Sequence, residues 1–111
     1  MITVDFEGIA TCKEGQRWLK LLDQPFYFIT SRFPNYKRHE IIEAEEEYSP
    51  QGVIYIFPFE NKIQFFNNNS VLHISANPAD CRLIKHTPSE ALFFHSSNFD
   101  SKWKSKSKKV L

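Results

Sequence analysis

The apolar segments of this chain are short, and residues that favour turns separate them. The longest run, Val53–Phe59, is VIYIFPF, whereas a helix that crosses a bilayer needs about 20 apolar residues. The first ten residues lack the basic start and the apolar stretch of a signal peptide. We therefore expect a cytoplasmic chain that is neither exported nor embedded in a membrane.

Aromatic residues supply much of the apolar surface. The 111 residues include eleven Phe, four Tyr and two Trp, which give a small domain large side chains to bury. A chain of this length forms one domain around one core. We expect a single domain over residues 1–100 and a basic, mobile C-terminal tail over residues 101–111.

Three elements are expected in the first third of the chain. Ile2–Phe6 alternates apolar and polar residues, which predicts a short strand. Thr11 and Glu14 match a capping box and start a helix over residues 12–23. Phe26–Arg32 is rich in aromatic and β-branched residues and predicts a second strand.

The segment 37–48 fits two structures. Its Glu and Ala residues favour a helix, and Ile41, Ala44 and Tyr48 share one helical face. It could also pair as an edge strand, with Ile42 and Ala44 on one side and the glutamates on the other. We favour the helix on propensity, and the choice stays open at this point.

The second half of the chain reads as a meander followed by a helix. Four short β runs alternate with turn residues: Val53–Phe59, Ile63–Phe66, Val71–Ser75 and Cys81–Lys85. Thr87, Pro88 and Glu90 then match the start of a helix that includes residues 91–95. The whole pattern predicts an α+β fold, with a mostly antiparallel sheet of five or six strands and two or three helices packed on one face.

The net charge of +1 is unevenly distributed. All thirteen acidic residues lie in residues 1–100, together with nine of the fourteen basic ones. The remaining five basic residues lie in the tail and are Lys102, Lys104, Lys106, Lys108 and Lys109. With Trp103 among them they could bind the phosphates and a base of a single strand, so a nucleic-acid-binding accessory protein is one hypothesis.

The sequence offers little support for catalysis. Cys12 and Cys81 are isolated and have no His at a metal-ligand spacing, so we expect two reduced thiols and no metal site. Cys81 could act as a nucleophile with His73 or His86, and a buried, inert thiol is the alternative. No phosphate-binding loop or nucleophile-elbow motif is present, so we expect no enzymatic activity and no cofactor.

The acidic segment EIIEAEEEYS, residues 40–49, is the most unusual part of the chain. Its five carboxylates are Glu40, Glu43, Glu45, Glu46 and Glu47. Like charges three or four residues apart on a helix repel each other. Such a cluster is either a solvated face or a surface that meets a basic partner. Three tyrosines could anchor that interface: Tyr36, Tyr48 and Tyr55. No Asp-rich loop with calcium-binding spacing accompanies the cluster.

Two segments, Gln16–Leu22 (QRWLKLL) and Val53–Leu72 (VIYIFPFENKIQFFNNNSVL), resemble parts of the small immunity proteins of contact-dependent growth inhibition in bacteria. The resemblance implies an inhibitor that binds one cognate toxin, often a nuclease, and shields its active site. It transfers no binding residue, because the contacts differ from pair to pair.

These observations lead to one expected function. The carboxylates of residues 40–47 would pair with Lys and Arg residues in the phosphate-binding cleft of a toxin with RNase or DNase activity. The tyrosines would close the rim of that interface. The sequence leaves open the toxin's identity, the stoichiometry of the complex and the oligomeric state of the free protein.

Overall fold

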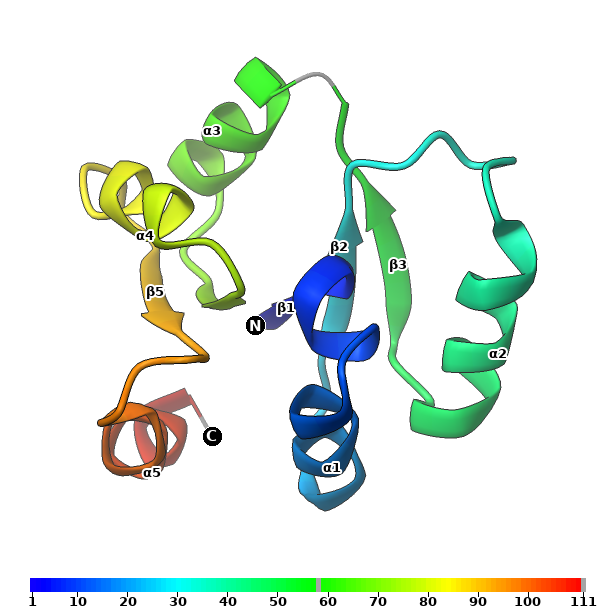
Figure 1. Ribbon diagram of the computed structural model, residues 1–111. Helices are drawn as coiled ribbons and strands as arrows, with labels where there is room; N and C mark the ends of the chain where they lie inside the picture. The colour runs from blue at the N-terminus through cyan, green and yellow to red at the C-terminus, as the bar shows by residue number, and fades with distance from the viewer. Residues whose placement is uncertain (58, 111) are drawn as a thin grey trace.

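The computed structural model describes the backbone of residues 1–57 and 59–110 and the side chains of residues 1–57 and 61–107. Strands and helices alternate along the chain (Figure 1). The strands are β1 (Ile2–Asp5), β2 (Tyr27–Thr30), β3 (Gly52–Tyr55), β4 (Leu72–Ser75) and β5 (Glu90–Phe93). The helices are α1 (Lys13–Leu21), α2 (Arg38–Tyr48), α3 (Phe59–Asn68), α4 (Pro78–Ile84) and α5 (Phe99–Val110), and an irregular turn η1 (Phe6–Ala10) follows β1.

All five strands form one parallel sheet in the order β3-β2-β1-β4-β5. In the central strand, Val4 is in register with Phe28 of β2 and with Ile74 of β4. The expected antiparallel sheet is therefore wrong. Parallel neighbours need a crossover connection, and a helix provides it between each pair of consecutive strands.

Helices cover both faces of the sheet, not one face as expected. The chain moves outward from β1 to β3, returns to β4 and then moves outward the other way. Right-handed crossovers in these two directions place α1 and α2 on one face and α3 and α4 on the other (Figure 1). Trp18 of α1 contacts Phe99 and Trp103 of α5, so α5 shares the face of α1 and α2.

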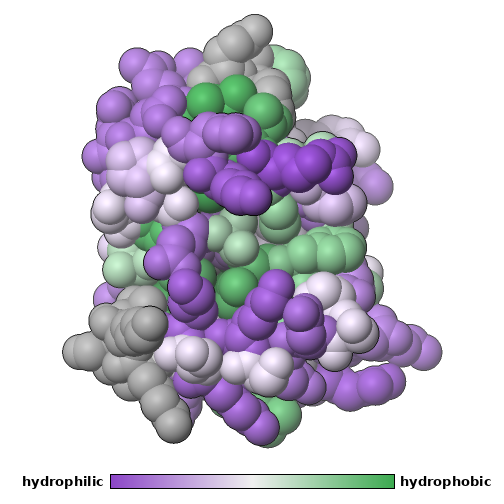
Figure 2. Space-filling model, turned by 90° about the vertical axis from the view of Figure 1, so that its left-hand side faces the viewer, coloured by the Kyte–Doolittle hydropathy of each residue, from purple (hydrophilic) through white to green (hydrophobic). Residues whose placement is uncertain are grey.

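Two apolar clusters hold these layers together. The larger lies between the sheet and α1, α2 and α5, and its fully buried strand residues include Val4, Phe28 and Ile74. The smaller lies under α3 and α4 and contains Ile29, Ile56, Phe66, Val71 and Ile84. The second cluster is smaller because polar side chains of β1 and β4 occupy part of the same face. Figure 2 views the side of α3, α4 and β5, where hydrophobic side chains lie between more hydrophilic ones.

Two expected strands are helices. Ile63–Phe66 belongs to α3, and Cys81–Lys85 lies in α4 and the residue that ends it. Phe66 of α3 is 1% exposed, and such burial is equally compatible with a helix and with a strand. Asn77 and Pro78 account for the start of α4. Asn77 Oδ1 accepts from the backbone N–H of Ala79 at 2.9 Å and so caps the helix, and Pro78 occupies the first turn.

The expected helix after Thr87 is also wrong, because residues 90–93 form strand β5. The Thr87 hydroxyl does accept a backbone N–H, that of Ser89 at 3.1 Å. That bond closes a turn and is not followed by a helix. Ser89 then donates its hydroxyl to the carbonyl of Phe66 at 3.0 Å, which fixes the start of β5 against α3.

Other expectations agree with the structure. Segment 37–48 is helical as favoured, since α2 spans Arg38–Tyr48 and buries Ile41 and Ala44. The first two strands and the first helix lie where their patterns predicted them. The cap of α1 differs: Cys12 Sγ accepts from the backbone N–H of Gly15 at 3.3 Å, and Thr11 accepts from Gly8.

Residues 101–110 of the segment expected to be a mobile tail form most of α5 instead, and Leu111 lies outside the described residues. Trp103 lies 5.3 Å from Trp18 between ring centroids, in an edge-to-face arrangement, and the Phe99 ring is 4% exposed. The lysines of residues 101–107 therefore project from a packed helix. Within the described ranges, no helix has the length and apolar character that a bilayer crossing requires.

Candidate functional site

The candidate site lies at the C-terminal ends of the central strands. The connections after β1 and β4 leave toward opposite faces of the sheet, and in parallel sheets ligands bind at such a switch point. A cleft of about 350 Å³ opens at this edge. Its lining comes from the ends of β1, β2 and β4 and from α3 and α4: Asp5, Glu7, Gly8, Ile29, Thr30, Ser31, Ile56, Lys62, Ala76, Asn77 and Asp80.

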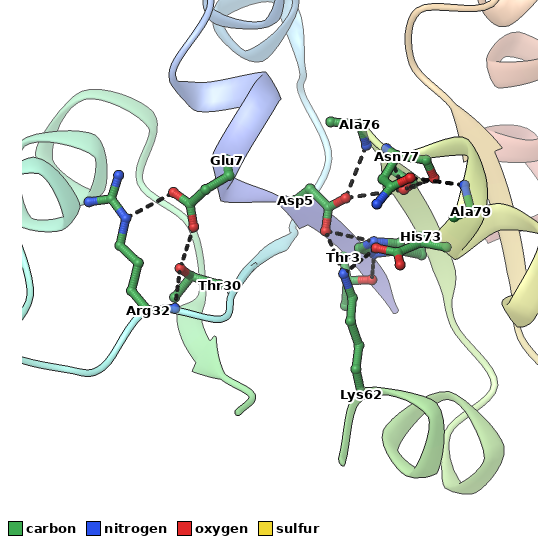
Figure 3. A network of polar contacts seen from close by, with 12 residues as sticks. Thr3, Asp5, Glu7, Thr30, Arg32, Lys62, His73, Ala76, Asn77 and Ala79 are labelled. Atoms are coloured by element: carbon green, nitrogen blue, oxygen red, sulfur yellow. Dashed lines mark hydrogen bonds and ion pairs between the residues drawn. The ribbon is translucent and has the colours of Figure 1, made fainter. Parts of the chain in front are cut away.

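Asp5, the last residue of β1, is the centre of a polar cluster (Figure 3). Its Oδ2 accepts the hydroxyl of Ser75 at 3.1 Å and the backbone N–H of Ala76 at 3.0 Å. Its Oδ1 lies 3.0 Å from His73 Nε2 and 3.3 Å from Lys62 Nζ. Donors thus reach both oxygens, and the carboxylate is held in one orientation.

His73 connects Asp5 to Thr3 within the sheet. Thr3 and His73 are register partners on β1 and β4, and both are fully buried. His73 Nδ1 lies 2.8 Å from the Thr3 hydroxyl. Because a carboxylate only accepts, Nε2 carries the hydrogen toward Asp5. The Nδ1 atom is within hydrogen-bond distance of the Thr3 hydroxyl, so each polar atom of the Thr3–His73–Asp5 series has a partner.

Lys62 reaches the cluster from α3, as Figure 3 shows. Its Nζ lies 2.6 Å from Asp80 Oδ2 as well as 3.3 Å from Asp5. Burial alone would raise the pKa of Asp5, but His73, Lys62 and the Ala76 N–H outweigh it and hold that pKa well below its usual range. Burial would likewise lower the pKa of Lys62, and the two carboxylates raise it instead. Both groups are therefore charged at neutral pH.

A second polar group lies on the β2 side of the cleft. The Thr30 hydroxyl donates to Glu7 Oε1 at 2.7 Å, and Arg32 Nε lies 2.9 Å from Glu7 Oε2. Arg32 also pairs with Glu40 of α2 at 2.7 Å and lies over the ring of Phe6. Glu7 is two residues after Asp5, so the cleft presents two carboxylates from one short segment.

The irregular turn η1 places these carboxylates. Gly8 has a φ of +87°, a conformation that residues with a side chain rarely adopt. A Cβ at Gly8 would lie 2.5 Å from the Cβ of Ala76. The turn after β1 therefore touches the loop after β4, and the two sides of the site meet there. Among the described residues, no group of three or more His, Cys, Asp or Glu side chains has the arrangement of a metal site.

The described contacts do not support the hypothesis that Cys81 acts as a nucleophile paired with a histidine. Burial raises the pKa of Cys81, and the nearby charges of Asp5 and Asp80 raise it further. A thiol with a raised pKa is a poor nucleophile at neutral pH. His73, one of the two expected partners, is hydrogen-bonded to Thr3 and Asp5 and not to Cys81.

The acidic segment lies on α2, away from the Asp5 cluster. Glu40 pairs with Arg32, and Glu47 lies 3.6 Å from Lys20 of α1. The other three carboxylates are exposed, and no ion pair involves them in the described part of the chain: Glu43, Glu45 and Glu46. A groove between α1 and α2 carries Glu40, Glu43 and Glu47 on its wall.

The three expected tyrosine anchors are dispersed. Tyr48 packs against the core, with its ring centroid 6.4 Å from that of Phe28. Tyr36 is 56% exposed and lies beside Arg32 and Lys37. Tyr55 ends the edge strand β3. Tyr48 lines the groove that carries Glu40, Glu43 and Glu47, whereas Tyr36 and Tyr55 do not line it.

The sites predicted from the sequence included one member of the Asp5 cluster, His73, and only as a partner of Cys81. The residues of the cluster are spread from position 3 to position 80, and only the strand order brings them together. One local signal was present: Asp5 directly follows the apolar strand residues of β1, and β4 carries a His and a Ser between apolar residues. Polar residues in fully buried strands need partners, and such partners mark a site.

Comparisons with known proteins add no assignment to this geometry. No protein-family model, no curated protein and no solved structure matches the chain.

Proposed function

We propose that this protein hydrolyses a phosphate monoester, with Asp5 as the nucleophile. The observation that carries the proposal is the position of Asp5, an ionised carboxylate at the end of the central strand that lines a cleft beside the ammonium group of Lys62. Aspartate is one of the side chains that enzymes use as nucleophiles toward phosphorus. A switch-point cleft is where a parallel sheet binds its ligand.

The reaction would have two steps. An oxygen of Asp5 attacks the phosphorus atom, the bond from phosphorus to the leaving oxygen breaks, and an acyl phosphate forms. Water then attacks the phosphorus of the acyl phosphate, inorganic phosphate leaves, and the Asp5 carboxylate is regenerated. Glu7 lines the same cleft and is placed to give a proton to the leaving oxygen and to accept one from the water.

The charges of the cleft make Mg²⁺ part of the proposal. Three carboxylates and one ammonium group line the cleft, and this surplus of negative charge would repel a phosphate dianion. Mg²⁺ is bound by one or two carboxylates together with water and substrate phosphate oxygens. Asp5 could supply such a carboxylate. Lys62 and the hydroxyl of Ser31 would donate to the remaining phosphate oxygens.

The test is phosphate release from p-nitrophenyl phosphate with added Mg²⁺. We expect turnover that EDTA abolishes and that Asp5→Asn lowers at least about a thousandfold, as removal of a nucleophile does in other enzymes. Hydroxylamine added during turnover should convert the acyl phosphate at Asp5 to a hydroxamate, which mass spectrometry of the digested protein locates. A wild-type protein without turnover of this probe or of any other phosphate monoester would refute the proposal.

Asp80→Asn is the matched control. Asp80 contacts the same Lys62 ammonium, so this variant disturbs the ion pairs in a similar way while leaving Asp5 intact. It should still form the hydroxamate at Asp5. The proposal departs from the sequence-based expectation of a non-enzymatic protein, and this assay decides between the two.

A second function is supported by a different surface. Glu43, Glu45 and Glu46 are exposed along α2 without a described cationic partner, as a surface for a basic protein requires. In this alternative a cytoplasmic toxin with RNase or DNase activity would bind α2. The resemblance to immunity proteins supports the same alternative.

Association rates test this alternative. The probe is the basic C-terminal domain of an exported polypeptide encoded next to this protein. Replacing the three exposed glutamates by Gln should slow association markedly at low salt, and the difference should shrink as salt rises. An unchanged rate at low salt would exclude the acidic face as the contact.

A further inference from the structure

Two phenylalanines lie unusually exposed next to the cleft. Phe33 is 63% exposed and Phe57 is 57% exposed. Their ring centroids are 4.8 Å apart, with the rings tilted by 50°. Single exposed apolar residues are common, but two rings that pack on each other and remain largely in water form a small apolar patch.

Phe33 and Phe57 follow the ends of β2 and β3, near the mouth of the cleft. The backbone N–H of Ile56 donates to the carbonyl of Thr30 at 2.9 Å, so β2 and β3 remain paired just beyond their ends. Ser31 and Ile56 line the cleft. Phe33 follows Ser31 by two residues and Phe57 directly follows Ile56, so the chain places both rings close to the mouth of the cleft, beyond its lining residues.

The wall is therefore divided by polarity. The β1 and α3 side carries Asp5, Glu7 and Lys62, whereas the β2 and β3 side carries Ile29 and Ile56, and the two rings follow in the chain just beyond that side. A complementary ligand has a charged group at one end and a flat, weakly polar group at the other. A cleft of about 350 Å³ has the volume for such a ligand, since sites for small organic molecules span about 300–1,000 Å³.

We infer that the substrate is a nucleoside monophosphate, whose base stacks on Phe33 and Phe57 while its phosphate lies at Asp5. This inference rests on the proposed phosphatase function. Bases stack on aromatic side chains without requiring specific hydrogen bonds. The pair Phe33–Phe57 therefore selects for the presence of a base and not for its identity.

The experiment compares kcat/KM for adenosine 5′-monophosphate and for ribose 5-phosphate, which lacks the base. The wild-type protein should prefer the nucleotide by about tenfold or more, given the strength of base stacking. In the double variant Phe33→Ala/Phe57→Ala, the value for the nucleotide should fall toward that for ribose 5-phosphate. Leu21→Ala is the control, because Leu21 is also exposed but ends α1, away from the cleft lining.

The outcomes separate this inference from the proposed function. Equal kcat/KM values for the two substrates in the wild type would overturn the inference and leave the phosphatase proposal standing. If neither substrate is hydrolysed, titration with adenosine followed by NMR decides. Binding by the wild type that the double variant loses supports the stacking pair, and absence of binding overturns it.

Sedimentation tests whether a second copy of the protein, and not a ligand, covers the patch formed by Phe33 and Phe57. A wild-type dimer that the double variant converts to a monomer would assign Phe33 and Phe57 to a contact between two copies. That result would overturn the inference. A wild type and a double variant that are both monomeric support a patch that is free to receive a ligand.

Discussion

Gly8 and Ala76 are in direct van der Waals contact across the two halves of the sheet. A Cβ on Gly8 would come within 2.5 Å of the Ala76 Cβ. Asp5 lies three residues before Gly8, and its carboxylate accepts the backbone N–H of Ala76. The distance between these two small residues therefore determines how Asp5 meets the loop after β4.

Gly8→Ala should destabilise the protein and disturb the site. The positive φ of Gly8 costs a residue with a side chain about 1–2 kcal/mol, and the contact with Ala76 adds to that cost. We expect a loss of at least about 2 kcal/mol in the free energy of unfolding, measured by urea denaturation. Gly52→Ala is the control, since its Cβ would meet the Tyr27 ring at 3.3 Å and that side chain can move. A Gly8→Ala protein as stable as this control would contradict the described contact.

Gly15→Ala tests the packing of η1 on α1. A Cβ at Gly15 would overlap the backbone carbonyl of Ile9, which cannot move without displacing the turn. Overpacking of this kind costs about 3 kcal/mol, despite the better helix propensity of Ala. Thermal unfolding monitored by circular dichroism gives the measurement. An increase in stability, as for a glycine inside an ordinary exposed helix, would mean that η1 does not lie against α1 in this way.

The Asp5–Lys62 pair predicts how stability depends on pH. The pKa of Asp5 is lowered in the folded state, so its contribution is present above the unfolded value of about 3.9 and is lost as pH falls below it. The pKa of Lys62 is raised, so its contribution is present below the unfolded value of about 10.4 and is lost as pH rises above it. The free energy of unfolding should therefore decline at both extremes.

Lys62→Met checks this assignment. It leaves Asp5 and Asp80 buried without their cation, which should cost about 3–5 kcal/mol at neutral pH. It should also remove the Lys62 contribution to the decline above pH 10. Urea denaturation across the pH range measures both effects. A variant with wild-type stability at neutral pH would show that the ammonium group does not compensate the two carboxylates.

Trp103→Ala tests the attachment of α5. The ring packs edge-to-face on Trp18 and stacks on Phe99, with a centroid distance of 6.5 Å to the latter. Because the ring is only half-buried, we expect a loss of about 2 kcal/mol, less than the 3–5 kcal/mol for a fully buried ring. Lys104→Ala, on the exposed side of α5, should change stability by less than about 0.5 kcal/mol. Equal stabilities of the two variants would contradict the packing of α5.

The same packing changes how the nucleic-acid hypothesis is tested. Truncation after Asp100 would remove Trp103 together with the lysines and so destabilise the domain. Replacement of Lys102 and Lys104 by Gln removes charge from exposed positions and leaves the Trp103 contacts in place. Loss of single-strand binding in this variant would then report on charge alone.

Local patterns predicted the elements whose side-chain periodicity is unambiguous. The alternation in Ile2–Phe6 and the β-branched run around Phe28 correspond to β1 and β2, and α2 follows the spacing of Ile41, Ala44 and Tyr48. These signals depend on neighbours within a few residues. They contain no information on whether the next strand is parallel or antiparallel.

The antiparallel interpretation failed for this reason. Ile63, Phe65 and Phe66 form an apolar run too short to distinguish a helix from a strand. Reading it as a strand turned a crossover connection into a hairpin, and the direction of every later strand followed from that error. The Thr87 pattern failed differently, because its hydroxyl has the same partner geometry in a turn as at a helix start.

The site could not be derived before the topology. Asp5 alone is a carboxylate after a strand, and Lys62 alone is a lysine in an ambiguous segment. Their contact requires β1 beside β4 and α3 above both strands. An error in strand direction separates these residues, and so the acidic segment 40–47 became the most prominent chemical feature of the sequence.

The central position of β1 has a consequence for biosynthesis. Val4 pairs with Ile74, so β1 waits for β4, the fourth of the five strands in the chain, before the middle of the sheet can close. Such long-range pairing slows folding. The groups that contact Asp5 from β4 and the residue after it, His73, Ser75 and Ala76, all follow residue 70, so a nascent chain cannot assemble the cluster around Asp5 before these residues have emerged.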